Sequence, residues 1–142
     1  MTSGIIEILK ENTALAALVG TDHRNEVKIY PFIAPEKVSQ PYIVVSEVSV
    51  SPAAAKMCIP SLDYANYEVN CYGLSFHGME ILQRACRAAL EVGQGFTTDA
   101  GALFGYIRMT TRRDLFLHGE GQGNGLYVKS GTYEAEVKGD IT

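Results

Sequence analysis

The sequence contains little cysteine, and the cysteines that it has form no recognisable motif. Cys58, Cys71 and Cys86 lie 13 and 15 residues apart, so no CxxC pair is present to chelate zinc or to exchange disulfides. An odd number of widely spaced cysteines is typical of reduced thiols. We therefore expect a fold that needs neither a disulfide nor a metal ion.

Long apolar runs and a basic N-terminal stretch are also missing. No segment reaches the roughly 18 consecutive apolar residues that a membrane-spanning helix needs. Glu7 and Glu11 interrupt the apolar pattern of the first residues, whereas a signal peptide starts with basic residues followed by an apolar run. The sequence predicts a protein that is soluble where it is made and that does not engage a membrane.

Basic residues are few and scattered. The 142 residues include 12 Lys and Arg against 16 Asp and Glu, for a net charge of −4. Apart from Arg112-Arg113 and the pair Arg84 and Arg87, no basic cluster forms the stripe that a nucleic-acid backbone requires. Specific nucleic-acid binding is therefore disfavoured.

What the sequence does contain is an ordinary globular composition, with 46% hydrophobic and 20% charged residues. A chain of this length fits one hydrophobic core, because single domains commonly hold about 100–150 residues. We expect one domain over residues 1–142.

Two segments show helical periodicity. Apolar residues recur every three or four positions from Gly4 to Leu18, with Thr2 or Ser3 available as a cap and Gly20 as a terminator. A second helix is predicted over His77–Val92, where a polar stripe (Glu80, Gln83 or Arg84, Arg87, Glu91) opposes an apolar face (Leu82, Ala85, Cys86, Ala89, Leu90).

Five segments are predicted as strands from β-branched content and period-two alternation. In the last of them the inward phase changes near Ser130-Gly131, which predicts a β-bulge at that glycine. The order of elements predicts an α+β domain: a mainly antiparallel sheet of about four to five strands with two helices on one face. The predicted strands are Val27–Tyr30, Tyr42–Val50, Tyr64–Tyr72, Ala102–Thr111 and Leu126–Val137.

Ser51–Asp63 is too long for a tight hairpin and should project from the sheet. Because it carries Met57, Ile59 and Leu62 without periodic packing, two interpretations are equally open: a contact arm for another subunit, or a locally collapsed surface loop.

The run Gly119–Gly125 contains four glycines and could in principle cradle a phosphate. However, no Lys-Ser or Lys-Thr follows it, Asn124 breaks the GxGxxG register, and a strand is predicted next. A flexible connection between strands is favoured, and such a loop can become ordered on a neighbouring subunit.

No constellation predicts catalysis. His23, His77 and His118 are far apart in sequence, and Asp114 and His118 would pair only in a helix. Alternation explains the carboxylates Glu68, Glu134 and Glu136 as a solvated strand face. We expect no enzyme, no metal site and no cofactor.

The ordered pattern of short segments resembles one known family. Leu15-Ala-Ala-Leu-Val-Gly20 is followed by Lys28-Ile-Tyr-Pro31, then by Gln40-Pro-Tyr-Ile-Val-Val45 and Tyr67-Glu-Val-Asn-Cys-Tyr-Gly-Leu-Ser75. Arg112-Arg113-Asp114 and Gly131-Thr-Tyr-Glu-Ala-Glu-Val137 complete it. In order and spacing these segments are similar to the tail-terminator, or tail-completion, proteins of long-tailed bacteriophages.

The resemblance implies a virion protein made in the host cytoplasm and located at the head-proximal end of the tail. Members typically form hexameric rings that bind the last ring of tail-tube protein, stop tube growth and meet a head-completion or neck protein, while DNA passes the lumen without specific binding. Alternatives are a head–tail connector, a minor tail-tube protein, or a small-ligand or nucleotide-binding module using Gly119–Gly125. Contacts in the family typically use loops and sheet edges, which here predicts Met57, Ile59, Leu62, Leu115, Phe116 and His118, within Pro52–Leu62 and Leu115–Gly125.

Overall fold

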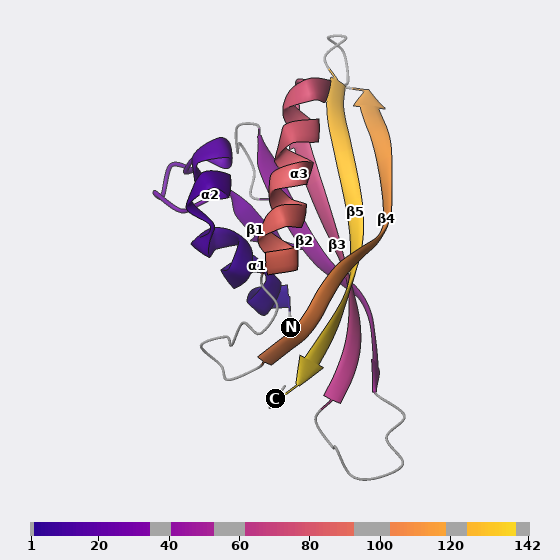
Figure 1. Ribbon diagram of the computed structural model, residues 1–142. Coiled ribbons are helices and arrows are strands. Elements are labelled where there is room, and N and C mark those ends of the chain that lie inside the picture. Colours follow the sequence, from indigo (N-terminus) through magenta and orange to yellow (C-terminus); the bar gives the residue numbers. More distant parts are fainter. Residues whose placement is uncertain (1, 35–40, 53–61, 93–102, 119–124, 139–142) are drawn as a thin grey trace.

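The computed structural model describes residues 2–34, 41–52, 62–92, 103–118 and 125–138. Its strands form one sheet in the order β1-β2-β3-β5-β4, in which only β1 and β2 run parallel. The helices cover one face of this sheet (Figure 1). The predicted α+β fold with a mainly antiparallel sheet is confirmed. The elements are α1 (Thr2–Glu11), α2 (Thr13–Val19), β1 (Ile29–Pro31), β2 (Tyr42–Pro52), β3 (Leu62–Gly73), α3 (Phe76–Val92), β4 (Leu103–His118) and β5 (Gly125–Lys138).

The first predicted helix is divided into two, so the described chain has three helices where two were expected. Asn12 has an extended backbone (φ −80°, ψ 108°), and its side-chain oxygen accepts a 2.9 Å hydrogen bond from the amide of Leu15. This is an N-cap, and it starts α2 one residue after α1 ends. Gly20 ends α2 as predicted: at φ +73° it donates its amide hydrogen to the carbonyl of Ala16.

The predicted bulge at Gly131 is wrong. β5 pairs with β3 in unbroken register, and the irregularities lie in β4, between Phe104 and Ile107 and between Met109 and Thr111. The apparent phase change arises because Val128 is buried on the helix-free face of the sheet, whereas Tyr133 is buried on the helix side. At Gly131 a Cβ would lie only 3.1 Å from the ring of Tyr133, so glycine leaves room for that ring.

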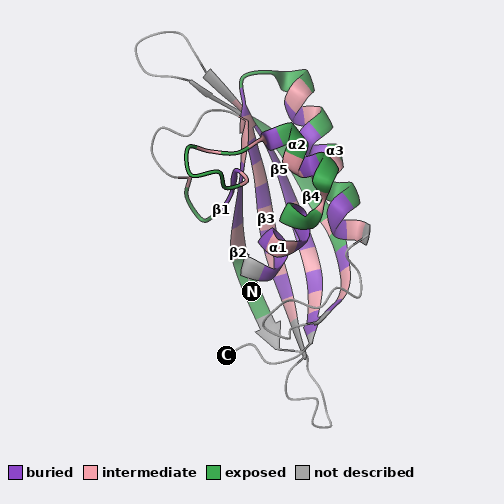
Figure 2. Ribbon diagram, turned by 90° about the vertical axis from the view of Figure 1, so that its left-hand side faces the viewer, coloured by how far each residue is buried: buried purple, intermediate pink, exposed green. Residues whose placement is uncertain are grey.

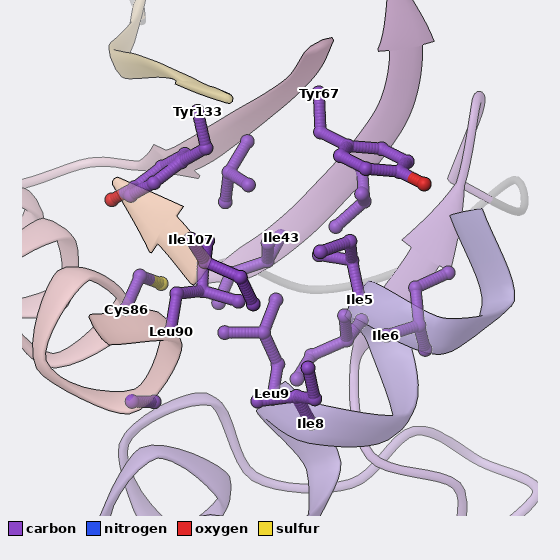
Figure 3. Close-up of a cluster of buried hydrophobic side chains, with 14 of the residues drawn as sticks. Ile5, Ile6, Ile8, Leu9, Ile43, Tyr67, Cys86, Leu90, Ile107 and Tyr133 are labelled. Carbon is purple, nitrogen blue, oxygen red and sulfur yellow. The ribbon is translucent and has the colours of Figure 1, made fainter. Parts of the chain in front are cut away.

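The core lies between the sheet and the helices, where the burial colours alternate along β3 and β5 (Figure 2). Figure 3 shows the rings of Tyr67 and Tyr133 reaching from these strands toward Ile5 of α1 and Leu90 of α3. All four side chains are fully buried. Burial of an aliphatic or aromatic side chain contributes about 1.5–3 kcal/mol, so this layer supplies the main stabilisation.

The two β-hairpins leave the sheet at opposite ends. Pairing of β2 with β3 extends to Pro52 and Asp63. Asp63 in turn faces Val137, close to the C-terminal end of β5. Pairing of β4 with β5 extends to His118 and Gly125, beyond the point where β3 ends at Gly73. At about 3.3 Å per residue, the 12-residue β3 alone separates these ends by roughly 36 Å.

Candidate assembly interface

The β2–β3 hairpin carries half of the predicted contact residues. Met57 and Ile59 lie outside the described residues. Leu62 is the first residue of β3, and its backbone pairs with Lys138. The strands β2 and β3 therefore define where the predicted arm leaves the sheet, and the role of its side chains stays a prediction.

The β4–β5 hairpin carries the other half, and here the predicted loop is partly wrong. Leu115–His118 belong to β4, which continues seven residues past the predicted end at Thr111. Leu115 pairs with Val128 and is 45% exposed; Phe116 and His118 pair through their backbones with β5, and their side chains are outside the described part.

An ion pair accommodates the charged residue Asp114 within β4. Asp114 lies directly opposite Lys129 in the ladder, and the Nζ atom of Lys129 is 2.9 Å from the Asp114 carboxylate. Opposite charges at facing positions stabilise a pair of strands. Because Asp114 and His118 lie in a strand, the helical pairing considered from the sequence does not form.

The described residues contain no cluster of three or more His, Cys, Asp or Glu side chains suited to a metal. Glu134 accepts hydrogen bonds from the Tyr106 hydroxyl at 2.8 Å and from Arg108 at 3.0 Å. These bonds, with the charge of Arg108, lower the pKa of Glu134 against the opposing effect of burial. Cys71 and Cys86 are buried with their sulfur atoms 3.8 Å apart, which confirms that both belong to the core.

Gly119–Gly125 connects two antiparallel strands, β4 and β5, and residues 119–124 lie outside the described part. The prediction that a strand follows this run is confirmed. A phosphate-cradling loop would instead lead into a helix N-terminus. The flanking elements thus give no support to a nucleotide site.

A strained turn after β1 presents two large apolar side chains to solvent. Ile33 donates its amide hydrogen to the carbonyl of Pro31 at 2.6 Å, which closes a γ-turn around Phe32, and Phe32 has φ +62°. Phe32 and Ile33 are 64% and 79% exposed. A non-glycine residue in this region costs about 1–3 kcal/mol, and such strain is concentrated at functional sites.

The chain before β1 is held by the carboxylate of Asp22. This carboxylate accepts hydrogen bonds from the Tyr30 hydroxyl at 2.9 Å and from the backbone amides of Arg24 and Glu26. Burial would raise the pKa of Asp22, but these bonds and the guanidinium of Arg24 outweigh it and lower the pKa from 3.8 to about 2. The same interactions help to fix Tyr30, two residues before Phe32.

An apolar groove of about 350 Å³ lies where α2, β3 and α3 meet. Leu18, Leu74 and Ile81 line it and are exposed, with Leu74 at 63%. None of its lining side chains is charged. Exposed apolar clusters of this kind mark sites of protein–protein contact. We call this surface the apolar groove; it is lined by Leu18, Pro41, Gly73, Leu74, Ser75, Gly78, Met79, Ile81 and Leu82.

A second, polar pocket lies between α3 and the strands β4 and β5. It is lined in part by Gln83, Arg112 and Lys129, and the Nε2 atom of Gln83 is buried without a hydrogen-bond partner. The helical pattern placed Gln83 on the solvated stripe, but it is buried. Arg84, the alternative member of that stripe, is exposed and pairs with Glu80 at 3.2 Å.

Sequence reasoning missed both the γ-turn and the apolar groove. A proline followed by two large apolar residues, Phe32 and Ile33, was the available signal for the turn. The groove places α2 against the end of β3 and the start of α3, which lie far from α2 in sequence, so no local pattern could reveal it.

Comparison with known proteins identifies the family. A family model for the tail completion protein gp17 matches residues 3–122. The chain belongs to this family. It is therefore a structural component of a phage-type virion tail, as the resemblance predicted.

Among solved structures, a chain from the "virion of native gene transfer agent (GTA) particle" matches with a TM-score of 0.68 and 17% identity. The match covers 98% of this chain and 95% of that chain, and at this identity it shows the fold alone. A search of curated proteins finds no match. Of the described helices, none is long and apolar enough to cross a membrane.

Proposed function

We propose that this protein is the ring-forming terminator of its tail: it caps the tail tube, stops tube polymerisation and joins the tail to the head or neck. The observation that carries the proposal is the position of the two hairpins. Because β2–β3 and β4–β5 leave the sheet at opposite ends, one subunit can contact the tube with one end and the neck with the other.

Two exposed apolar surfaces also support a ring. The γ-turn and the apolar groove leave large apolar side chains exposed, among them Phe32 and Leu74. Exposed apolar surface of this kind favours association, and two different surfaces on one subunit can build a ring if the rotation between copies closes. We propose a hexamer built from a single domain over residues 1–142, at the head-proximal end of the tail.

The partners follow from this position: copies of the same chain, the tail-tube protein and a head-completion or neck protein. An excess of acidic over basic residues, 16 to 12, suits a lumen through which DNA passes without binding, since like charges repel. A ring with a basic lumen would overturn that part of the proposal.

The test uses the tail-tube protein from the same genome. The proposed terminator is added while the tube protein polymerises. Substoichiometric amounts of the terminator should halt tube growth, and electron microscopy should show a ring on one end of each short tube. Tubes that grow to normal length with no ring at either end would contradict the proposal.

The same experiment separates the related alternatives. A minor tail-tube protein should be incorporated along the tube, and a head–tail connector should bind the neck protein but leave tube growth unchanged. Leu115→Asp addresses the β4–β5 end: if that end meets the tube, capping weakens, and if it meets the neck, only head joining weakens. Val48→Asp, at an exposed position within β2 and away from the β4–β5 end, is the matched control.

A further inference from the structure

We propose that Phe32 and Ile33 of one copy insert into the apolar groove of the next copy, and that this contact repeats around the ring. The inference rests on the proposed ring and names its lateral contact. Its partner is a second copy of this chain, because the chain itself carries both halves of the contact.

The two halves do not cover each other within one subunit. Phe32 donates its amide hydrogen to the carbonyl of Val45 at 2.9 Å, whereas the groove is lined by Pro41, which directly precedes β2 and lies four positions before Val45. Four residues of strand span about 13 Å. Phe32 is 64% exposed and Leu74 in the groove is 63% exposed, so among the described residues neither half of the contact is covered.

The two surfaces match in chemistry. Pro31, Phe32, Ile33 and Ala34 carry no charge, and the groove has no charged lining residue. Their contact would therefore remove apolar surface from water without stranding a charge in the interface. The groove volume of about 350 Å³ lies at the low end of the roughly 300–1,000 Å³ of small-molecule pockets, which gives room for two side chains of this size.

The γ-turn is held in place before contact. Its backbone is fixed by the hydrogen bonds from Phe32 to Val45 and from Ile33 to Pro31. Side chains on a fixed backbone lose less conformational freedom on binding, so more of the contact energy appears as affinity. This gives the strained conformation of Phe32 a role that the monomer alone does not explain.

The arrangement determines the type of symmetry. Because the γ-turn and the apolar groove are different surfaces, each copy uses its turn on one neighbour and its groove on the other. A repeated heterologous contact of this kind closes into a ring or continues as a filament, whereas a self-complementary contact would stop at a dimer.

Disulfide cross-linking tests the contact. In a Cys58→Ser background, Phe32→Cys combined with Leu74→Cys should, on mild oxidation, give a ladder on a non-reducing gel that ends at the ring stoichiometry. A mixture of the two single variants should give no band above the dimer. The matched control pairs Leu74→Cys with Val48→Cys, a position on β2 that is 58% exposed and should give no ladder.

Cross-linking is carried out both on the free protein and on capped tubes, so that the contact and the proposed function fail separately. Caps that form normally without a Phe32–Leu74 ladder would overturn the contact but leave the terminator proposal intact. A ladder in the free protein without any tube capping would support the contact and overturn the terminator proposal.

Charge insertion gives a second readout. Ile33→Asp and Ile81→Asp should each raise the protein concentration needed for ring formation at least tenfold. The unfolding temperature of the subunit should stay near that of the wild type, because both side chains are exposed. Rings of unchanged stability in both variants would overturn the contact.

Discussion

The hydroxyl of Tyr30 donates a 2.9 Å hydrogen bond to the carboxylate of Asp22, across the turn that precedes β1 and the exposed Phe32. This pair links the conformation of the turn to pH, because the pKa of Asp22 is lowered to about 2 in the folded protein.

Asp22→Asn should lower the stability of the fold at neutral pH and make that stability depend less on pH in the acid range. The carboxylate has a folded pKa below its ordinary value of 3.8, so its contribution is fully present above about pH 4 and is lost as the pH falls through about 2. Thermal unfolding between pH 7 and pH 2 measures this. Tyr30→Phe, which removes one bond and keeps the carboxylate, should show a smaller loss; identical pH profiles for wild type and Asp22→Asn would contradict the assignment.

Asn12→Ala should destabilise the protein by about 1 kcal/mol, because it removes the side-chain acceptor for the amide of Leu15 at the start of α2. Urea denaturation gives the free energy of unfolding. Asn12→Asp keeps an acceptor and should retain most of the stability. An alanine variant as stable as the wild type would show that α2 does not depend on this cap.

Features that depend on residues close together in sequence were predicted better than features that depend on distant segments. The period-two pattern of Tyr64–Tyr72 gave the buried face of β3 correctly, because alternation along a strand reports directly on which face is dry. Asn12 was overlooked because the apolar spacing continues across it, although asparagine is a common N-cap. The bulge was predicted wrongly because Val128 is buried on the helix-free face. In a sequence, a strand with apolar residues buried on both faces shows the same change of alternation as a strand with a bulge.

The candidate interface was less accessible to prediction. The strand was predicted to end at Thr111, but β4 continues to His118, and Lys129, fifteen positions after Asp114, pairs with that carboxylate across the ladder. The apolar groove depends on Leu18, Leu74 and Ile81 meeting in space, which only the tertiary arrangement decides.

The ion pair between Asp114 and Lys129 should respond asymmetrically to mutation. Asp114→Ala leaves the buried ammonium of Lys129 without its carboxylate and should cost about 1–2 kcal/mol. Lys129→Met should be nearly neutral, because Asp114 is 52% exposed and can be hydrated, and a methionine thioether can pack on the ring of Phe76 in place of the ammonium. Chemical denaturation of both variants tests this, and a larger loss for Lys129→Met would refute the argument.

The thiols of Cys71 and Cys86 should be unreactive in the folded protein. Both are buried, and the hydrogen bond with Cys71, together with burial, raises the pKa of the Cys86 thiol well above its ordinary value. In a Cys58→Ser variant, an aromatic disulfide reagent at about pH 8 should label neither thiol until urea unfolds the chain. Rapid labelling of the native protein would show that the α3–β3 contact opens readily.

The most direct test of the central claim is the length of tails in particles made without this protein. Deletion of its gene should give heads separated from tails, and electron microscopy should show tubes longer and more variable than in the wild type. Supplying the intact chain in trans should restore joined particles with uniform tails. Joined particles with tails of normal length in the deletion strain would contradict the account.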